Sequence, residues 1–201
     1  MTDYVIPCDT FYRISRVAAT RDDEIHPSWS SMRIDDGCLI ASDRSFMAVE
    51  NYTAHQKGVA HLNIDPALIE QCRTEAKFNG RVTVTVNEIL KYAQAKTTFG
   101  YVTKENLLYT ADLDPDWDRW REIINKAREP ATKPNGVMFW HADNIQRLAE
   151  SSPSGRVVFE SVIDTSRPTL LRDVTDYHWL GIFQARSRYE QYSPATVPTW
   201  I

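Results

Sequence analysis

The chain has few cysteines, few glycines and no long apolar segment. It holds three cysteines and seven glycines in 201 residues. Because the cysteines are odd in number and widely spaced, at Cys8, Cys38 and Cys72, a disulfide framework and a Cys-x-x-Cys zinc site are disfavoured. No run approaches the roughly 20 apolar residues that span a bilayer, and residues 1–9 carry no basic lead. We therefore expect buried thiols in a soluble cytoplasmic protein without membrane association.

Catalytic and metal-binding motifs are also missing. The five histidines form no His-x-x-x-His pair, and no glycine-rich phosphate loop occurs. The acidic series from Asp112 to Asp118 lacks the glycine and closing glutamate of a calcium loop. Asp35, Asp36 and Gly37 are typical of a hairpin turn. The sequence predicts a protein that is not an enzyme and uses no cofactor or metal; an enzyme on the same scaffold is the least favoured alternative.

An excess of positive charge is absent as well. The formal net charge is −4, with 42% hydrophobic and 25% charged residues. This composition is typical of a soluble globular protein with a substantial core. A contact with nucleic acid would therefore depend on a local group of cations, because the chain as a whole does not attract phosphate.

One plan occurs three times along the chain: a short apolar strand, an amphipathic helix of about a dozen residues, and several β-rich segments. The first unit covers residues 4–52, with a helix at 10–20 on the apolar positions Phe11, Ile14 and Ala18. The second begins at residue 60, and Asp65 followed by Pro66 starts its helix. The helix of the third carries Ile145, Leu148 and Ala149. The pattern predicts an α+β fold of repeated strand–helix–β-meander units with antiparallel sheets.

The strands and domain boundary follow from the same pattern. Extended segments are expected at residues 31–34, 38–51, 60–64, 81–86, 89–94, 97–102, 137–140, 156–163, 168–173 and 178–184. Residues 126–136, rich in Lys, Pro, Asn and Gly, are the best linker candidate. We predict a domain of two units at 1–125 and a third, half-domain unit with a C-terminal tail at 137–201.

The segment before this linker has two interpretations. Arginines and lysines of residues 119–133 stand beside Trp117 and Trp120, a mixture that suits single-stranded nucleic acid. Alternatively, the three-residue interval between the tryptophans marks the apolar face of a short helix that seals a domain junction. The second interpretation is favoured, because periodic aromatic residues usually face a core.

Four segments give the chain a resemblance to a known family. Residues 37–43, 60–66, 109–124 and 157–186 occur in the order of the equivalent segments of the bacterial DNA sliding clamp, the β subunit of the replicative polymerase. The chain resembles this family over nearly its whole length. It differs in holding about one and a half domains instead of three, in having Leu113, Asp114 and Pro115 where clamps usually place Phe-Pro, and in continuing through residues 187–201.

The resemblance implies a DNA-facing surface. In a clamp the helices line the hole through which duplex DNA passes, and basic side chains there meet phosphates without reading bases. A helical wheel directs Arg13 and Arg16 away from the sheet. The implied DNA-binding residues are Arg13, Arg16, Arg73, Lys77 and Arg147. The alternative is that these cations only solubilise exposed helix faces.

The resemblance also implies a partner-binding surface near the chain end. Clamp partners bind a hydrophobic cleft close to the C-terminus, so the implied residues are Trp179, Ile182, Phe183, Trp200 and Ile201. The tail at 187–201 either folds back on its own domain, which is favoured, or docks into a neighbouring subunit or partner protein.

These observations predict a sliding-clamp-like DNA replication protein, a processivity factor encoded by a phage or mobile element and acting in the cytoplasm of the infected bacterium. It would bind duplex DNA without sequence preference as a homo-oligomer, tether replication proteins such as a DNA polymerase, or do both. The alternative is a clamp mimic or adaptor that binds or inhibits a replication partner without encircling DNA.

Overall fold

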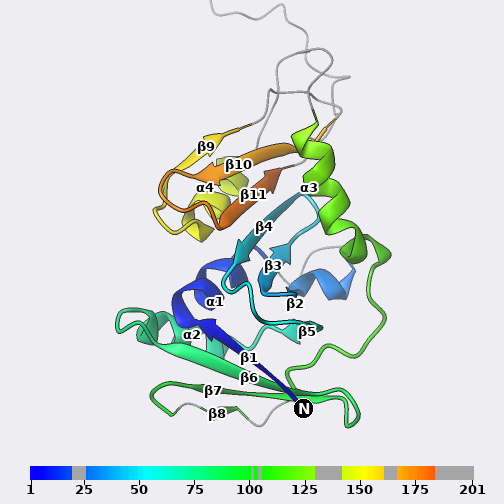
Figure 1. Ribbon diagram of the computed structural model, residues 1–201, viewed down its shortest axis with the longest axis vertical. Helices are drawn as coiled ribbons and strands as arrows, with labels where there is room; N and C mark the ends of the chain where they lie inside the picture. The colour runs from blue at the N-terminus through cyan, green and yellow to red at the C-terminus, as the bar shows by residue number, and fades with distance from the viewer. Residues whose placement is uncertain (20–25, 101, 104–105, 130–141, 161–166, 184–201) are drawn as a thin grey trace, which may run out of the picture.

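Two antiparallel sheets and their helices make up the computed structural model, which describes residues 1–19, 26–100, 102–103, 106–129, 142–160 and 167–183 (Figure 1). The helices are α1 (Cys8–Ser15), α2 (Pro66–Ala76), α3 (Trp120–Arg128) and α4 (Ala142–Ser151), with 3-10 turns η1 (Pro27–Ser30) and η2 (Pro115–Arg119). The first strands are β1 (Thr2–Pro7), β2 (Ser31–Asp35), β3 (Cys38–Ser42), β4 (Phe46–Asn51), β5 (Val59–Asn63) and β6 (Arg81–Asn87). The remaining strands are β7 (Tyr92–Thr97), β8 (Val102–Thr103), β9 (Val157–Phe159), β10 (Thr169–Asp173) and β11 (Trp179–Phe183).

Alternating side chains build both sheets. The smaller sheet has the order β1-β6-β7-β8; in β6, Val82, Val84 and Val86 point inward, while Thr83 and Thr85 are half-exposed. The larger sheet has the order β5-β2-β3-β4-β11-β10-β9. Apolar groups cover both faces of its central part, which explains why β2, β3, β4, β10 and β11 are buried along almost their whole length.

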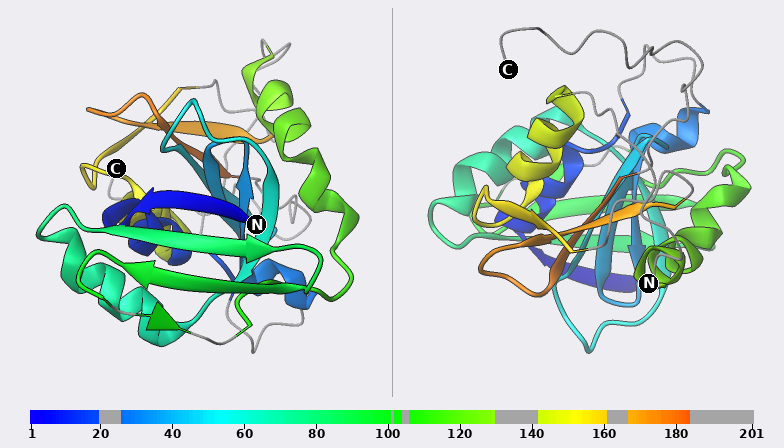
Figure 2. Two further views of the ribbon diagram at one scale, coloured as in Figure 1. Left: turned by 60° about the horizontal axis from the view of Figure 1, so that its bottom comes forward. Right: turned by 90° about the horizontal axis from the view of Figure 1, so that it is seen from above.

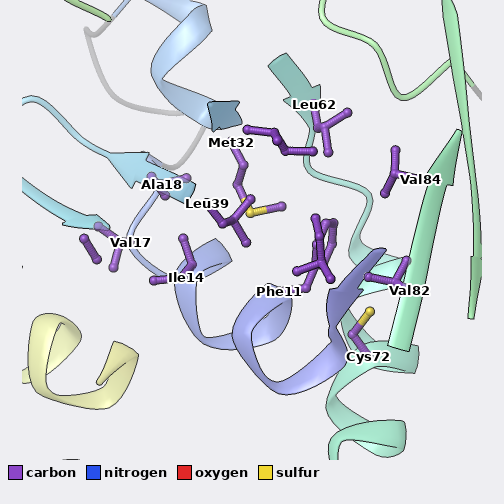
Figure 3. Close-up of a cluster of buried hydrophobic side chains, with 14 of the residues drawn as sticks. Phe11, Ile14, Val17, Ala18, Met32, Leu39, Leu62, Cys72, Val82 and Val84 are labelled. Carbon is purple, nitrogen blue, oxygen red and sulfur yellow. The ribbon is translucent and has the colours of Figure 1, made fainter. Parts of the chain in front are cut away.

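The core on the inner face of the larger sheet joins both sheets to the helices. Phe11 and Ile14 of α1 meet Met32 and Leu39 of the larger sheet and Val82 of the smaller one (Figure 3). The outer face holds a second cluster, in which Ile40, Met47, Val49, Leu170, Leu180 and Ile182 pack against Trp29, Trp117, Trp120 and Ile124. The helical interpretation of Trp117 and Trp120 is confirmed, because both are buried on η2 and α3.

The larger sheet continues from the first unit into the third. Strand β11 pairs antiparallel with β4, with Phe183 opposite Phe46 and Trp179 opposite Glu50. Helix α3 packs on residues from both units. The expected linker at 126–136 lies mostly outside the described residues, and the division into 1–125 and 137–201 stays a prediction.

Three helices lie on one side of the larger sheet. Helix α1 packs on α2, on α4 and on β3 and β4, whereas α3 lies on the opposite side, as the view from above shows (Figure 2). We refer to α1, α2 and α4 as the helix layer. None of the described helices is long and apolar enough to cross a membrane.

Caps and turns explain where several elements begin and end. Asp65 Oδ1 accepts hydrogen bonds from the backbone N–H groups of Ala67 at 2.8 Å and Leu68 at 3.2 Å, so the predicted cap of α2 is confirmed. The predicted hairpin turn is confirmed as well: Asp36 and Gly37 have φ angles of 48° and 80°, and a Cβ on Gly37 would lie 1.8 Å from the Thr53 carbonyl oxygen.

Several expected boundaries are wrong because turn residues act there. The first helix ends at Ser15 instead of residue 20, and the expected extended segment 38–51 is divided where Asp43 Oδ1 accepts from the N–H groups of Ser45 and Phe46. The expected strand 89–94 starts only at Tyr92, because Asn87 to Lys91 form a turn. The expected strand 97–102 is interrupted: Thr97 ends β7, Thr98 and Phe99 form a turn, and Val102 begins β8. The expected strand 137–140 lies outside the described residues.

Candidate nucleic-acid interface

Arg13 on α1 is buried, so the exposure predicted from the helical wheel is wrong. Its guanidinium donates to Glu50 on β4 at 2.8 and 3.0 Å, to Asp9 at 2.8 Å and to the Ser151 carbonyl of α4 at 2.7 Å. Only 8% of the residue is exposed. The helix is covered by β3, β4 and α4 on several sides, so a position that a single sheet would leave open becomes an internal ion pair.

Arg147 on α4 closes the carboxyl end of α1. Its Nη2 group donates to the carbonyls of Val17 at 3.2 Å and Ala18 at 3.0 Å, and its guanidinium lies 4.7 Å above the Phe46 ring. Nη1 reaches Asp43 at 3.4 Å. A cation at the end of a helix satisfies carbonyls that have no partner within the helix. Arg147 therefore joins the third unit to the first.

The other three predicted cations are more exposed. Arg16 forms an ion pair with Glu150 on α4. Arg73 forms two hydrogen bonds with Glu70 one turn earlier on α2, at 2.8 and 2.6 Å. Lys77 follows the end of α2 and is exposed. The structure thus places Arg16, Arg73, Lys77 and Arg147 on the helix layer and removes Arg13 from its surface.

The charges of the helix layer are balanced. Besides Arg16, Arg73, Lys77 and Arg147, the layer carries carboxylates of comparable number at Asp9, Glu70, Asp143 and Glu150. Exposed pairs of this kind are screened by salt and leave little net field. Affinity for phosphates through this layer should therefore be weak.

A buried polar network fastens α3 to the outer face of the larger sheet. Asp35 accepts hydrogen bonds from Trp120 Nε1 at 2.9 Å and from both terminal nitrogens of Arg121 at 3.0 and 2.7 Å. Burial raises the pKa of Asp35, but the hydrogen bonds from Arg121 and Trp120 outweigh burial and hold this pKa below its usual value. The carboxylate therefore stays charged and keeps α3 in register.

His61 on β5 lies beside this network. Its ring meets the edge of Trp117 with 5.4 Å between centroids, and neither ring nitrogen has a hydrogen-bond partner among the residues that the structure describes. Burial, followed by the charge of Arg33, lowers the pKa of His61 to about 4. The imidazole is thus neutral at physiological pH.

Comparison with solved structures identifies the fold. A DNA polymerase sliding clamp from Pseudomonas aeruginosa superposes with a TM-score of 0.61 at 12% sequence identity, covering 92% of this chain and 66% of the clamp chain. The DNA polymerase III β subunit from Thermotoga maritima gives a TM-score of 0.56 at 10% identity, with 92% and 65% coverage. The chain has the fold of the bacterial sliding clamp. No protein-family model and no curated protein sequence matches it.

The clamp-like chain spans just under two thirds of the length of these clamp subunits. The predicted resemblance to the clamp and the predicted α+β fold with antiparallel sheets are both confirmed. At such low identity the likeness concerns the fold alone, and the part in DNA binding implied for the helix layer stays a prediction.

The predicted partner-binding residues lie mostly inside the clamp-like chain. Trp179 and Phe183 belong to the inner core, so they offer no surface to a partner while β11 is paired. Ile182 faces outward and borders a hollow of about 260 Å³ together with Trp29, Met47 and Ile123. Trp200 and Ile201 lie outside the described residues.

Sequence reasoning missed a second hollow, of about 420 Å³, between α3 and the larger sheet. Leu180, Val49 and Ile124 contribute apolar groups to it, and Arg121, Arg128 and Arg172 contribute cations. The basic residues of the segment 119–133 were the available signal. The pairing of β11 with β4 brings Leu180 beneath α3, and this pairing could not be predicted from the sequence.

Proposed function

We propose that the clamp-like chain is a DNA-replication protein that encloses duplex DNA as a homo-oligomer, with the helix layer facing the duplex. The observation that carries this proposal is the position of α1, α2 and α4 together on one side of the larger sheet, in a fold similar to that of DNA polymerase sliding clamps. The enclosed duplex would be held without sequence preference, because contacts between cations and phosphates carry no sequence information.

The charge balance of the helix layer supports a protein that stays on DNA because it encloses the duplex, and not because it binds the duplex tightly. Its exposed cations share the surface with a similar number of carboxylates, so open contact with a duplex would be weak and salt-sensitive. A closed oligomer would remain on the duplex although each contact is weak. Strands β8 and β9 stand at one end of the strand order of each sheet, and the end of a sheet is a place where a second copy could add a strand.

Light scattering with and without DNA at low salt tests the proposal first. We expect a defined oligomer, and we expect it to remain on closed circular DNA while it leaves linear DNA by sliding off the ends. The variant R73E/K77E should weaken association with duplex, because it reverses two exposed charges of α2 without touching α1 or α4. Arg13 is unsuitable for this test, since its substitution would disturb the buried ion pair with Glu50.

The runner-up is a clamp mimic or adaptor that binds a replication partner such as a DNA polymerase without enclosing DNA. The two hollows beside β11 support this alternative, because they combine apolar groups with exposed cations on the outer face. A monomer or simple dimer that ignores both forms of DNA would exclude enclosure. In that case, loss of partner binding in the variant R44E/R128E, which reverses one exposed cation at each hollow, should be compared with R73E/K77E, which should still bind the partner.

A further inference from the structure

Two phenylalanines form an exposed pair at one end of the smaller sheet. Phe78 follows the end of α2, and Phe99 lies in the turn between β7 and β8. Their ring centroids are 6.0 Å apart with an interplanar angle of 82°. Phe78 is 67% exposed and Phe99 62% exposed. A single exposed apolar side chain is ordinary, but two aromatic rings from distant segments held together in water indicate a contact surface.

A buried carboxylate holds this pair in place. Glu75 on α2 is only 1% exposed and accepts hydrogen bonds from Gln71 Nε2 at 2.8 Å, from Thr97 Oγ1, and from the Phe99 backbone N–H at 3.3 Å. These bonds tie the turn that carries Phe99 to the helix that precedes Phe78. Gly80, two residues after Phe78, has to be glycine, because a Cβ at this position would lie 2.7 Å from Glu75 Cβ. The rings are therefore presented by a rigid support.

Three cations lie near the pair, next to it in the sequence or on the strands β6 and β7 beside it. Lys77 is the chain neighbour of Phe78, and the Arg81 backbone N–H donates to Thr98 Oγ1 at 2.7 Å, beside Phe99. Lys96 is an exposed residue of β7, two residues before Thr98, and pairs with Thr83 of β6. Within the described part of the chain, the side chains of Lys77, Arg81 and Lys96 form no hydrogen bond or ion pair. This distinguishes them from the paired arginines of the helix layer.

We propose that Phe78 and Phe99 form a platform on which bases of single-stranded nucleic acid stack, while Lys77, Arg81 and Lys96 bind its phosphates. Rings combined with unpaired cations are the arrangement that single-strand binding uses, since every base has an aromatic face and every nucleotide a charge. An intact duplex conceals its base faces within the stack. The inference goes beyond the proposed function, because it requires neither ring closure nor a duplex.

Fluorescence anisotropy of labelled oligothymidine, about 15 nucleotides long to cover typical single-strand sites, tests the platform at low salt with the full chain. We expect F78A/F99A to weaken binding at least ~10-fold, because stacking contributes about 1–3 kcal/mol per base. F78L/F99L should be equally impaired, since leucine keeps apolar area but has no aromatic face. F78Y/F99Y should restore binding.

The matched control is I89A/L90A, which removes two exposed apolar side chains, 91% and 67% exposed, from the turn between β6 and β7. This variant should bind oligothymidine as the unmodified chain does. The duplex affinity of F78A/F99A should also be unchanged, and circular dichroism should show that every variant is folded.

Each remaining outcome separates the two proposals. Binding to duplex but not to oligothymidine would overturn the platform and leave enclosure intact, whereas the reverse would overturn enclosure and support the platform. Undiminished binding by F78L/F99L would show that the rings do not stack bases. Binding to phosphatidylserine vesicles that is lost in F78A/F99A, without oligothymidine binding, would assign the pair to a membrane surface and reject the inference.

Discussion

Glu50 and Arg13 form a buried ion pair between β4 and α1. The side chains are 7% and 10% exposed, and Thr10 Oγ1 donates to the same carboxylate at 2.6 Å. Removing the Glu50 charge leaves the buried guanidinium with only the half-exposed carboxylate of Asp9 as a counter-charge. We therefore expect E50Q to lower the free energy of unfolding by about 3–5 kcal/mol, the cost typical of a broken buried pair. Urea denaturation at neutral pH measures this change.

The control for this prediction is E70Q on α2. Glu70 pairs with Arg73 through two hydrogen bonds of similar length, but both side chains are more than half exposed. Exposed pairs contribute roughly 0–1 kcal/mol. Equal destabilisation by the two substitutions would contradict the assignment of Arg13 to the interior.

His61 should make the stability of the protein depend on pH. Burial and Arg33 lower the pKa of His61 from 6.5 to about 4, so between these values the unfolded chain binds the proton more readily than the folded one. The stabilisation is complete above pH 6.5 and is lost as the pH falls toward 4, by up to roughly 3 kcal/mol. The nearby carboxylate of Asp35 has a lowered pKa and therefore contributes mainly below this window.

The substitution H61F tests this prediction. Phenylalanine keeps the ring contact with Trp117 and removes two nitrogens that have no hydrogen-bond partner. Urea unfolding of H61F should change little between pH 6.5 and pH 4.5, whereas the unmodified protein should lose stability steadily. If the free energies of unfolding of the two proteins fell equally with pH, a group other than His61 would be responsible for the pH dependence.

At the scale of elements, Arg147 connects α4 to the end of α1. Its fork of donors reaches two carbonyls while its plane covers Phe46, and a lysine at this position could reproduce neither feature. We expect R147K to destabilise the protein by about 1–3 kcal/mol, as for other hydrogen bonds to charged groups. Hydrogen exchange of Ala142–Ser151 should accelerate more than that of α2.

R73K on α2 is the matched control for R147K. Arg73 is exposed and forms its ion pair with Glu70 of its own helix, so this substitution should leave the exchange of α4 unchanged. Equal acceleration in both variants would indicate that α4 does not depend on Arg147 for its docking.

Local signals predicted the elements that depend on neighbouring residues. The cap at Asp65, the turn at Asp36 and Gly37, and the valine alternation of β6 are features of a few consecutive positions. The bounds expected for the strands at 89–94 and 97–102 were wrong for the complementary reason, since only residues 92–94, 97 and 102 are extended. Apolar or β-branched residues there, such as Ile89 and Leu90, belong to exposed turns whose geometry depends on Asn87 and on the hydrogen bonds to Glu75.

At the scale of the whole molecule, the larger sheet makes the two predicted domains depend on each other. A fragment ending at residue 129 would leave β4 without β11 and would expose Met47, Val49 and Trp120 of the outer cluster. We expect this fragment to aggregate or to remain partly folded, because an open apolar edge strand pairs with other chains. Size-exclusion chromatography and circular dichroism check this expectation, and a monomeric, cooperatively unfolding fragment would contradict it.

The sequence alone determined the repeated strand–helix–meander plan, the α+β class, the cap of α2 and the burial of Trp117 and Trp120, since short-range periodicity encodes all of them. Tertiary structure decided the roles of the arginines. Arg13, Arg16 and Arg147 each have at least one partner more than 100 positions away, across the contact between α1 and α4. The pairing of β4 with β11 and the packing of α4 on β4 hold the third unit beside α1, and no local pattern records the partner that a distant segment will bring.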